Sequence, residues 1–265
     1  PYPERKKRVE KFLLRLGDFQ NPDGGFGYYP ESRYSGWFLT IFTTDFMLDA
    51  RQAGYRLDDG LYNRAREYLK KICQNSIDSR YPYSMNIKLL NVAYAAYVLA
   101  RDGIILQDTV NNLFEMRERM PLEGISYLIR IFEKTGDFPD NMQPVLTRAL
   151  LNHAKDEPTR THFENRADPY WWTVHGSSVR TTATVFDTLL LVYQRFPLAP
   201  KIARCMFKTL RDRQYLVTQE HLAVIKAFEK YFERYELTDP DNVSRKYLHQ
   251  TKLAGTRGTD FLFYG

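Results

Sequence analysis

Apolar residues recur at helical spacing along most of the chain, in segments separated by glycine, proline or polar residues. The first such segment has the single apolar stripe of an amphipathic helix, formed by Val9, Phe12, Leu13 and Leu16. The same pattern predicts ten helices, at about residues 4–19, 37–53, 59–72, 86–101, 107–117, 122–134, 142–154, 179–195, 199–213 and 218–235. Most of the chain is therefore predicted to be all-α.

The predicted helices differ in how many of their faces are apolar. Segments 86–101 and 179–195 are apolar on more than one side and are expected on the inside of the fold. Helix pairs recur about every 35 to 55 residues, with the first member more apolar. Stacking such pairs into a closed or curved double layer buries both faces. This favours an α/α toroid, an α6/α6 barrel lacking its first helix pair. An open α-solenoid is the alternative, although no fixed repeat period is visible.

Two parts of the chain depart from this helical rhythm. Between Thr159 and Ser178 the pattern predicts an irregular or strand-like excursion. From Asp239 onwards a turn signal is followed by loosely alternating segments. We therefore predict a toroid domain at 1–237 and, at 238–265, a short β-like tail or the start of a following β domain.

Composition and charge exclude several classes of protein. The chain is 43% apolar and 26% charged, as in ordinary globular proteins. The net charge of +6 comes from scattered residues, and the one basic run, Arg5–Arg8, has no interleaved aromatics. Such a run indicates a solvated helix face rather than a nucleic-acid site. No apolar run reaches the length of about 18 residues that a membrane span needs. The chain opens directly on a helix, without a signal peptide, as expected of a piece of a longer polypeptide.

The cysteines and histidines do not suggest a metal or cofactor. Cys73 and Cys205 are too few for a disulfide framework or a zinc site, and both lie in apolar helical segments. We expect two buried thiols, with one long-range disulfide as the alternative. The five histidines show no ligand spacing.

A stretch of turn formers separates the first two predicted helices. It contains a proline, which presets φ, and two glycines, which accept positive φ without strain. A second glycine stop follows the second helix. Together these features predict a tight aromatic-backed hinge motif, formed by Gln20, Asp23, Gly24, Gly25, Phe26, Trp37, Gly54 and Tyr55. If φ of Gly25 is positive, as we expect, Gly25→Val should cost about 1–3 kcal/mol of stability.

The same stretch carries a family resemblance. The pattern Gln-x-x-Asp-Gly-Gly-Phe at 20–26, then Trp-Phe-Leu-Thr at 37–40 and the helix end at 50–57, resembles the thioester-domain region of bacterial alpha-2-macroglobulins. Segments 178–183 and 218–231 resemble later helices of that domain. The resemblance implies a domain of a broad-spectrum protease inhibitor that traps target proteases. It also implies contacts with other domains of one long polypeptide, and a location in the periplasm or cell envelope.

The family resemblance implies an internal thioester, but this sequence lacks the motif that forms it. The family's internal thioester joins a Cys thiol to a Gln carboxamide within Cys-x-Glu-Gln. Cys73 is followed by Gln-Asn-Ser, and Cys205 by Met-Phe-Lys. We therefore expect no thioester in this chain, either because it lies upstream of Pro1 or because this member lacks it. The chain itself is predicted to be a structural and interaction module.

An enzyme is the alternative, because similar glycine turns occur in other α/α toroids such as terpenoid cyclases and polysaccharide lyases. The nearest acidic strings, at Asp58 and Asp239, are predicted to be a helix cap and a turn rather than a cyclase motif. A lyase would need basic and aromatic side chains, which Arg160, Arg166, Tyr170, Trp171 and Trp172 could supply. The last three are also a candidate interaction surface, with a packing plug as the simpler interpretation.

Overall fold

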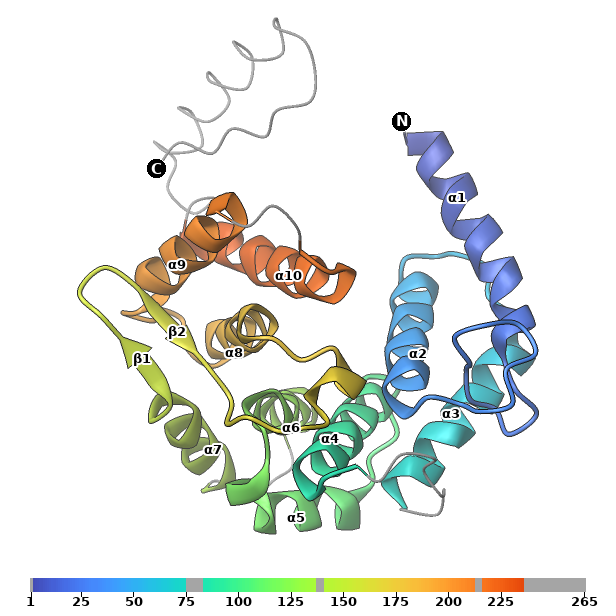
Figure 1. Ribbon diagram of the computed structural model, residues 1–265, viewed down its shortest axis with the longest axis horizontal. Coiled ribbons are helices and arrows are strands. Elements are labelled where there is room, and N and C mark those ends of the chain that lie inside the picture. Colours follow the sequence, from blue (N-terminus) through green and yellow to red (C-terminus); the bar gives the residue numbers. More distant parts are fainter. Residues whose placement is uncertain (1, 75–82, 137–140, 213–215, 236–265) are drawn as a thin grey trace, which may run out of the picture.

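The computed structural model describes residues 2–74, 83–136, 141–212 and 216–235, and these form an all-α fold, as predicted (Figure 1). The α-helices of this described part are α1 (Tyr2–Arg15), α2 (Trp37–Gln52), α3 (Asp59–Cys73), α4 (Met85–Arg101), α5 (Gln107–Glu115), α6 (Leu122–Thr135), α7 (Met142–Leu151), α8 (Ser178–Val192), α9 (Ala199–Asp212) and α10 (Thr218–Tyr235). Short 3-10 turns cover Leu16–Phe19, Arg117–Arg119 and Trp171–Val174. The predicted tail and its boundary at residue 237 lie outside the described residues.

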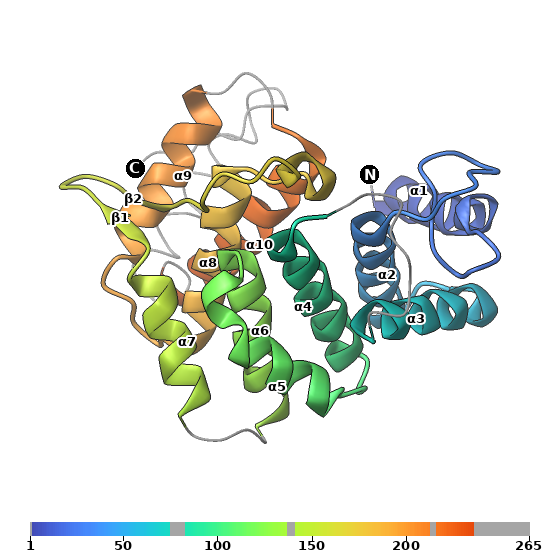
Figure 2. The same cartoon turned by 60° about the horizontal axis from the view of Figure 1, so that its bottom comes forward.

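The helices form two rows, one inside the other. Helices α2, α4, α6, α8 and α10 follow one another in an arc, and α3, α5, α7 and α9 lie outside it (Figures 1 and 2). The ends of the arc are joined by an ion pair, 3.1 Å between Lys226 Nζ of α10 and Asp49 Oδ2 of α2. Helix α1 lies outside α2, so α2–α3 is the first complete pair. The described inner row has five helices, one fewer than an α6/α6 barrel.

Local signals in the sequence set several helix ends. Asp58 caps α3 as predicted, because its Oδ1 accepts a hydrogen bond from the Leu61 backbone N–H at 2.5 Å. Ser84 caps α4 in the same way. Gly136 ends α6 with φ of 63°, the left-handed conformation that glycine adopts without strain.

The excursion predicted between the seventh and eighth helices begins with a small hairpin. Strand β1 (Ala154–Asp156) pairs antiparallel with β2 (Thr161–Phe163), with Lys155 opposite His162. The seventh helix therefore ends at Leu151, earlier than predicted, because the chain has already turned into β1. Phe163 at the end of β2 is fully buried against the inner row.

The core lies between the two rows and consists of three clusters. The largest joins the helices α4 to α10 around residues such as Leu128, Phe186 and Leu189. The second joins α2, α3 and α4, and the third packs the end of α1 on α2 and α3. Helices α4 and α8, predicted to be internal, are in the inner row. Both cysteines are free thiols and partly buried.

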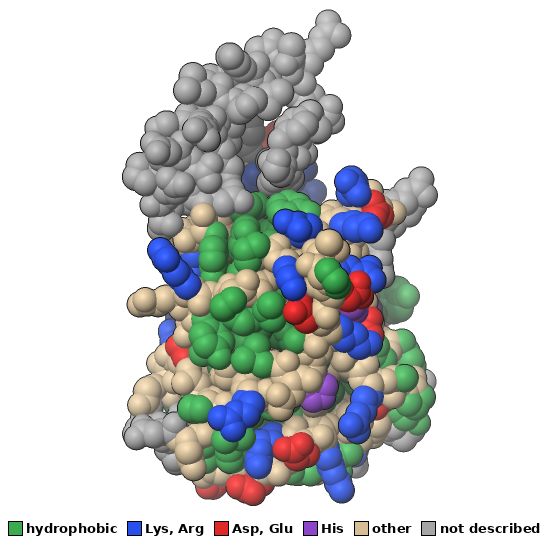
Figure 3. Space-filling view, turned by 90° about the vertical axis from the view of Figure 1, so that its left-hand side faces the viewer, with side chains coloured by type: hydrophobic (Ala, Val, Ile, Leu, Met, Phe, Trp, Pro, Cys, Tyr) green, Lys and Arg blue, Asp and Glu red, His purple; other side chains and the backbone are tan. Residues whose placement is uncertain are grey.

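The face of the molecule shown in Figure 3 carries no basic patch. Over α7, α9 and the hairpin, Lys and Arg side chains are interspersed with Asp and Glu, and a group of apolar side chains lies together near the middle of this face (Figure 3). None of the helices in the described part combines the length and the apolar character needed to cross a bilayer.

Candidate functional site

The predicted hinge motif is a rigid turn held by side-chain hydrogen bonds. Gln20 Nε2 donates to the carbonyl oxygens of Gly24, at 3.0 Å, and of Leu61, at 2.9 Å. Gln20 Oε1 accepts from Arg64 Nε at 2.9 Å. One amide, which both donates and accepts, therefore closes the turn and ties it to α3, which explains why a Gln stands at this position.

Asp23 closes the same turn from the other side. Its Oδ1 accepts from the backbone N–H of Gly25, at 2.9 Å, and from Ser35 Oγ, at 2.8 Å. These are charge-assisted bonds, so Asp23 stabilises the turn. Phe26 is buried, and its backbone N–H donates to Thr40 Oγ1 at 2.8 Å.

The two glycines of the turn have different roles from those predicted. Positive φ occurs at Gly24, with 94°, and not at Gly25. The prediction that Gly25 has a positive φ is therefore wrong. Gly25 is required for space instead, because a Cβ there would overlap Ser35 and come within 2.8 Å of the Tyr68 ring. Its substitution should still be unfavourable, through a clash rather than through φ.

The remaining residues of the predicted motif frame α2. Trp37 is the first residue of this helix, buried, with its ring centroid 5.5 Å from that of Tyr83. Gly54 follows the helix with φ of 81°, and the Tyr55 side chain packs on the third cluster. The motif thus joins α1, α2 and α3, and it lies apart from the pocket described below.

Residues 164–177, which we term the strap, cross the starts of the inner helices. Asn165 Oδ1 accepts from the backbone N–H of Leu122, at the start of α6, at 2.8 Å. Asn165 Nδ2 donates to Glu123 Oε2 at 2.6 Å and to Thr181 Oγ1 at 3.0 Å. Ser84 Oγ, at the start of α4, donates to Asp168 Oδ2 at 2.5 Å. The strap therefore ties together the starts of three inner helices, α4, α6 and α8.

The three aromatic residues of the predicted interaction surface lie on the strap, but they differ in burial. Tyr170 and Trp171 pack against the second core cluster, and the Trp171 indole lies directly against Gly176. Trp172 is 63% exposed. Arg166 is exposed, and Arg160 pairs with Glu157, at 2.6 Å, in the turn between β1 and β2. The structure does not gather these five residues into one site.

Replacing Asn165 with alanine is expected to lower the free energy of unfolding by about 1–3 kcal/mol. The fully buried Glu123 carboxylate would lose a donor, and the Leu122 N–H would lose its acceptor. Urea unfolding followed by circular dichroism measures this. The control is Asn111→Ala, since Asn111 is exposed and its Oδ1 accepts a long hydrogen bond, 3.3 Å, from Gln107 Nε2. Equal losses in both variants would contradict the role assigned to Asn165.

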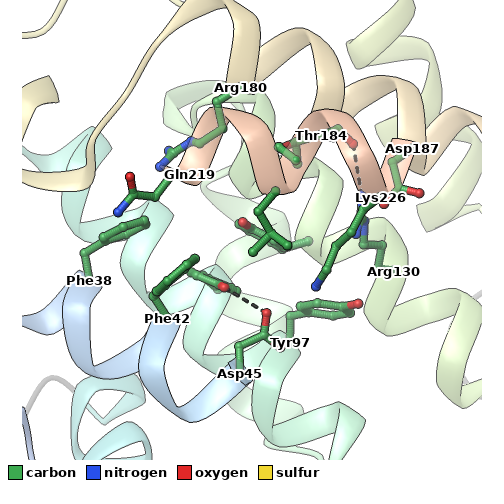
Figure 4. A pocket seen from close by; sticks show the side chains of 14 residues that line it. Phe38, Phe42, Asp45, Tyr97, Arg130, Arg180, Thr184, Asp187, Gln219 and Lys226 are labelled. Atoms are coloured by element: carbon green, nitrogen blue, oxygen red, sulfur yellow. Dashed lines mark hydrogen bonds and ion pairs between the residues drawn. The ribbon is translucent and has the colours of Figure 1, made fainter. Parts of the chain in front are cut away.

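A pocket lies on the axis of the arc, enclosed by all five inner helices (Figure 4). Its volume is about 70 Å³. Aromatic rings form much of its wall, with Tyr94 and Tyr127 stacked at 4.4 Å between centroids. Its lining residues are Phe38, Phe42, Asp45, Tyr94, Tyr97, Tyr127, Arg130, Arg180, Thr184, Asp187, Gln219, Leu222, Ala223 and Lys226.

Ion pairs surround this axial pocket in three groups. Asp187 pairs with Arg130, at 2.6 Å, and with Lys230, at 2.5 Å. Glu123 lies 3.6 Å from Arg180 Nη2. The third group joins α2 to α4 and α10. We call the charged residues of all three groups the axial cluster: Asp45, Asp49, Glu123, Asp187, Arg101, Arg130, Arg180, Lys226 and Lys230.

The charge states of these groups follow from their partners. Burial by itself would raise the pKa of Asp187, but Arg130 and Lys230 outweigh it and hold this pKa below its usual value. Burial, reinforced by Asp45, raises the pKa of Tyr94 well above its usual value. Near neutral pH Asp187 is therefore an ionised carboxylate paired with cations, and Tyr94 is a protonated phenol. The carboxylates of the pocket are already engaged by cations. The pocket is therefore suited to binding a ligand through charge and hydrogen bonds.

Metal ligation finds no support in the described residues. Within them, no group of three or more His, Cys, Asp or Glu side chains could hold a metal ion. His175 stands beside the pocket with φ of 48°, and burial together with Arg180 lowers its pKa. Its Nε2 lies 3.4 Å from Tyr28 Oη.

Sequence reasoning singled out none of the axial cluster. A usable signal existed, namely a single charged residue inside an otherwise apolar helix. Arg130 stands between Ile129 and Ile131, and Asp187 follows Phe186. Such residues are rarely buried unless paired, so each predicts a partner on a neighbouring helix.

Comparison with known proteins gives one consistent group of relatives. No family model matches the chain. The alpha-2-macroglobulin of Escherichia coli K12 is 25% identical over 240 residues, which is 84% of this chain and 13% of that protein. The homologue from Yersinia pestis is 23% identical over 252 residues, covering 86% of this chain and 11% of the homologue. The chain thus spans a small part of these relatives.

Solved structures share the fold. A mutant Salmonella alpha-2-macroglobulin superposes with a TM-score of 0.74 at 22% identity, covering 86% of this chain and 14% of that one. A native E. coli alpha-2-macroglobulin fragment that extends to the C-terminus gives 0.71 at 22% identity, covering 86% and 35%. Relatives in sequence and neighbours in fold agree on one family, the bacterial alpha-2-macroglobulins, to which this chain is related.

Proposed function

We propose that this chain is the α/α toroid, thioester-type domain of a bacterial alpha-2-macroglobulin-like protein that inhibits proteases by trapping them. The observation that carries the proposal is the relationship to the E. coli protein over 84% of this chain, together with the shared fold. Structures of the E. coli protein are described as activated by trypsin and by porcine elastase. Proteases of this kind are therefore the proposed targets.

In this function the chain supplies structure and contacts. The turn at Gln20 and the strap hold the double row of helices together, and the axial carboxylates are tied up in ion pairs. Neither cysteine lies in Cys-x-Glu-Gln, so the chain contributes no thioester of its own. Its partners are other domains of the same polypeptide and, through them, the trapped protease. The proposed location is the periplasm or cell envelope.

The test is a size-selective protease assay on the longest polypeptide that contains this chain. Trypsin or elastase is mixed with it, and cleavage of a large protein substrate is compared with cleavage of a small chromogenic peptide. Trapping predicts that cleavage of the large protein substrate falls while cleavage of the small peptide persists. If cleavage of both substrates is unchanged, protease trapping is contradicted.

The enzyme alternative is tested on the same preparation. Turnover of uronic-acid polymers or of isoprenoid diphosphates, abolished by Arg166→Ala, would replace the inhibitor assignment by a catalytic one. Arg166 is exposed on the strap, so its substitution leaves the core intact.

A further inference from the structure

Four exposed aromatic side chains lie on the loop before α2 and on the strap beside it. They are Tyr28, Tyr29 and Tyr34 of residues 27–36, which we term the tyrosine loop, and Trp172 of the strap. Their exposed fractions run from 53% to 75%. Tyr28 Oη lies 3.4 Å from His175 Nε2, so the tyrosine loop and the strap are in contact. In the described residues, Phe12 of α1 is the only other exposed Phe, Tyr or Trp. We call the four side chains the aromatic face.

Hydrogen bonds hold the tyrosine loop in one conformation. The backbone N–H groups of Gly27 and Gly36, at its two ends, donate to carbonyl oxygens earlier in the chain at 3.0 and 2.9 Å. Between them, the Ser32 N–H donates to the Tyr29 carbonyl oxygen at 3.2 Å. Ser32 Oγ donates to the Tyr34 carbonyl oxygen at 3.0 Å. A loop that is already ordered loses little freedom on binding, so its tyrosines are pre-organised for a contact.

Strained backbone occurs at two points beside the aromatic face. Pro30 and Glu31 form the centre of the turn closed by Ser32, and Glu31 has φ of 61°, which glycine would adopt without strain. His175, which contacts Tyr28, has φ of 48°. These are the only non-glycine residues with positive φ in the described part of the chain. Such strain clusters at functional sites, where the surrounding structure imposes it.

The composition of this surface is that of a protein interface. Tyr, Trp and Arg are enriched at interface centres, and the aromatic rings give a large contact area for few rotatable bonds. Beside the aromatic face, Arg33 of the tyrosine loop and Arg166 of the strap are exposed. Neither forms an ion pair within the described residues. Flat rings together with unpaired guanidinium groups fit a protein partner.

The local charge favours an acidic partner. Helices α2 and α8 begin beside the aromatic face without an acidic residue in the first turn, so their partial positive charge adds to that of Arg33 and Arg166. Glu31 is the only exposed Asp or Glu of the tyrosine loop and the strap. Glu164 and Asp168 of the strap are partly buried and are already bonded within the chain.

We propose that the aromatic face docks a neighbouring domain of the same longer polypeptide. That domain presents apolar side chains to the rings and carboxylates to Arg33 and Arg166. The chain corresponds to 13% of the E. coli relative, so most of such a polypeptide lies outside it. The inference rests on the proposed function for this longer polypeptide alone. It needs no protease to be trapped, so docking and trapping can fail separately.

The test is hydroxyl-radical footprinting, read residue by residue by mass spectrometry and without any protease present. This chain alone is compared with the longest polypeptide that contains it. Tyr29 and Trp172 should be oxidised more slowly in the longer polypeptide, by about fivefold or more, because interface centres exclude water. Ile105 is the internal control, since it is 38% exposed and follows the end of α4, on the opposite side of the ring. Its rate should stay the same.

Two variants and a matched control separate docking from folding. Tyr29→Ser removes the most exposed ring of the aromatic face, and Arg33→Glu reverses a surface charge. Both should leave the melting temperature of the chain alone unchanged and restore the oxidation rate of Trp172 in the longer polypeptide. Arg56→Glu reverses an exposed charge beyond the end of α2, and it should leave Trp172 protected.

Three results would overturn the proposal. One is an equal oxidation rate of Trp172 in both polypeptides. Another is protection of Trp172 that persists in Tyr29→Ser and in Arg33→Glu. The third is a dimer of the chain alone, seen by sedimentation velocity, in which Tyr29 is protected. Such a dimer would assign the aromatic face to a second copy of the chain.

Discussion

Replacing Asp187 with alanine is expected to lower the free energy of unfolding by about 3–5 kcal/mol. The carboxylate is 7% exposed and pairs with Arg130, which is 10% exposed, and with Lys230. Its removal leaves two cations in the core with no counter-charge, and the cost comes mainly from those unpaired charges. Urea unfolding of the wild-type and variant proteins at pH 7 measures the difference.

The matched control is Glu67→Ala, which breaks a pair with Lys70 on the surface of α3. Glu67 is 56% exposed, so we expect a loss of about 0–1 kcal/mol. A loss at Asp187 no larger than that at Glu67 would mean that the axial ion pairs do not stabilise the fold.

The pH dependence gives a second check on the same residue. The folded-state pKa of Asp187 is depressed, so its stabilisation is fully present above the unfolded value of about 3.9. It is lost as pH falls through the lower folded-state pKa. The difference between wild type and Asp187→Ala should therefore be constant from neutral pH to about pH 5 and narrow in stronger acid.

Replacing Gly24 with alanine is expected to cost about 3 kcal/mol or more of stability. A side chain at φ of 94° is strained, which costs on the order of 1–3 kcal/mol. The added Cβ would in addition overlap the backbone carbonyl oxygen of Arg64 on α3. A backbone atom cannot rotate aside as a flexible side chain can, so the turn would have to separate from α3. Thermal and urea unfolding both measure the loss.

Gly54→Ala separates the two contributions. Gly54 also has positive φ, of 81°, but no atom lies within 4 Å of its would-be Cβ. Strain alone should then cost about 1–2 kcal/mol. If both variants lose the same amount of stability, the overlap of the added Cβ with α3 does not contribute to the loss at Gly24.

The sequence alone was sufficient for the helices and the turn. Helical periodicity depends on neighbours three and four residues apart, so the pattern predicted α10 at the bounds the structure shows, and Asp58 as the cap of α3. The turn at Gln20–Phe26 was recognisable because proline and glycine act on the local backbone. The same local signals carried the resemblance to the bacterial alpha-2-macroglobulins.

The exchange of roles between Gly24 and Gly25 needed the tertiary structure. Either glycine could supply positive φ, and only the positions of Arg64, Ser35 and Tyr68 decide which one does. The strap was predicted as irregular, but its function of tying the starts of the inner helices depends on partners far away in the sequence, such as Asn165 with Leu122.

The axial pocket is the part that only the tertiary structure decided. A single charged residue inside an apolar helix predicts that it has a partner but not which residue that partner is, so the sequence could not pair Asp187 with Arg130 and Lys230. Closing five helices into an arc brings these charges together and removes water from around them. Burial then makes each ion pair matter to stability, and it leaves Arg180 with a donor that nothing in the described chain accepts.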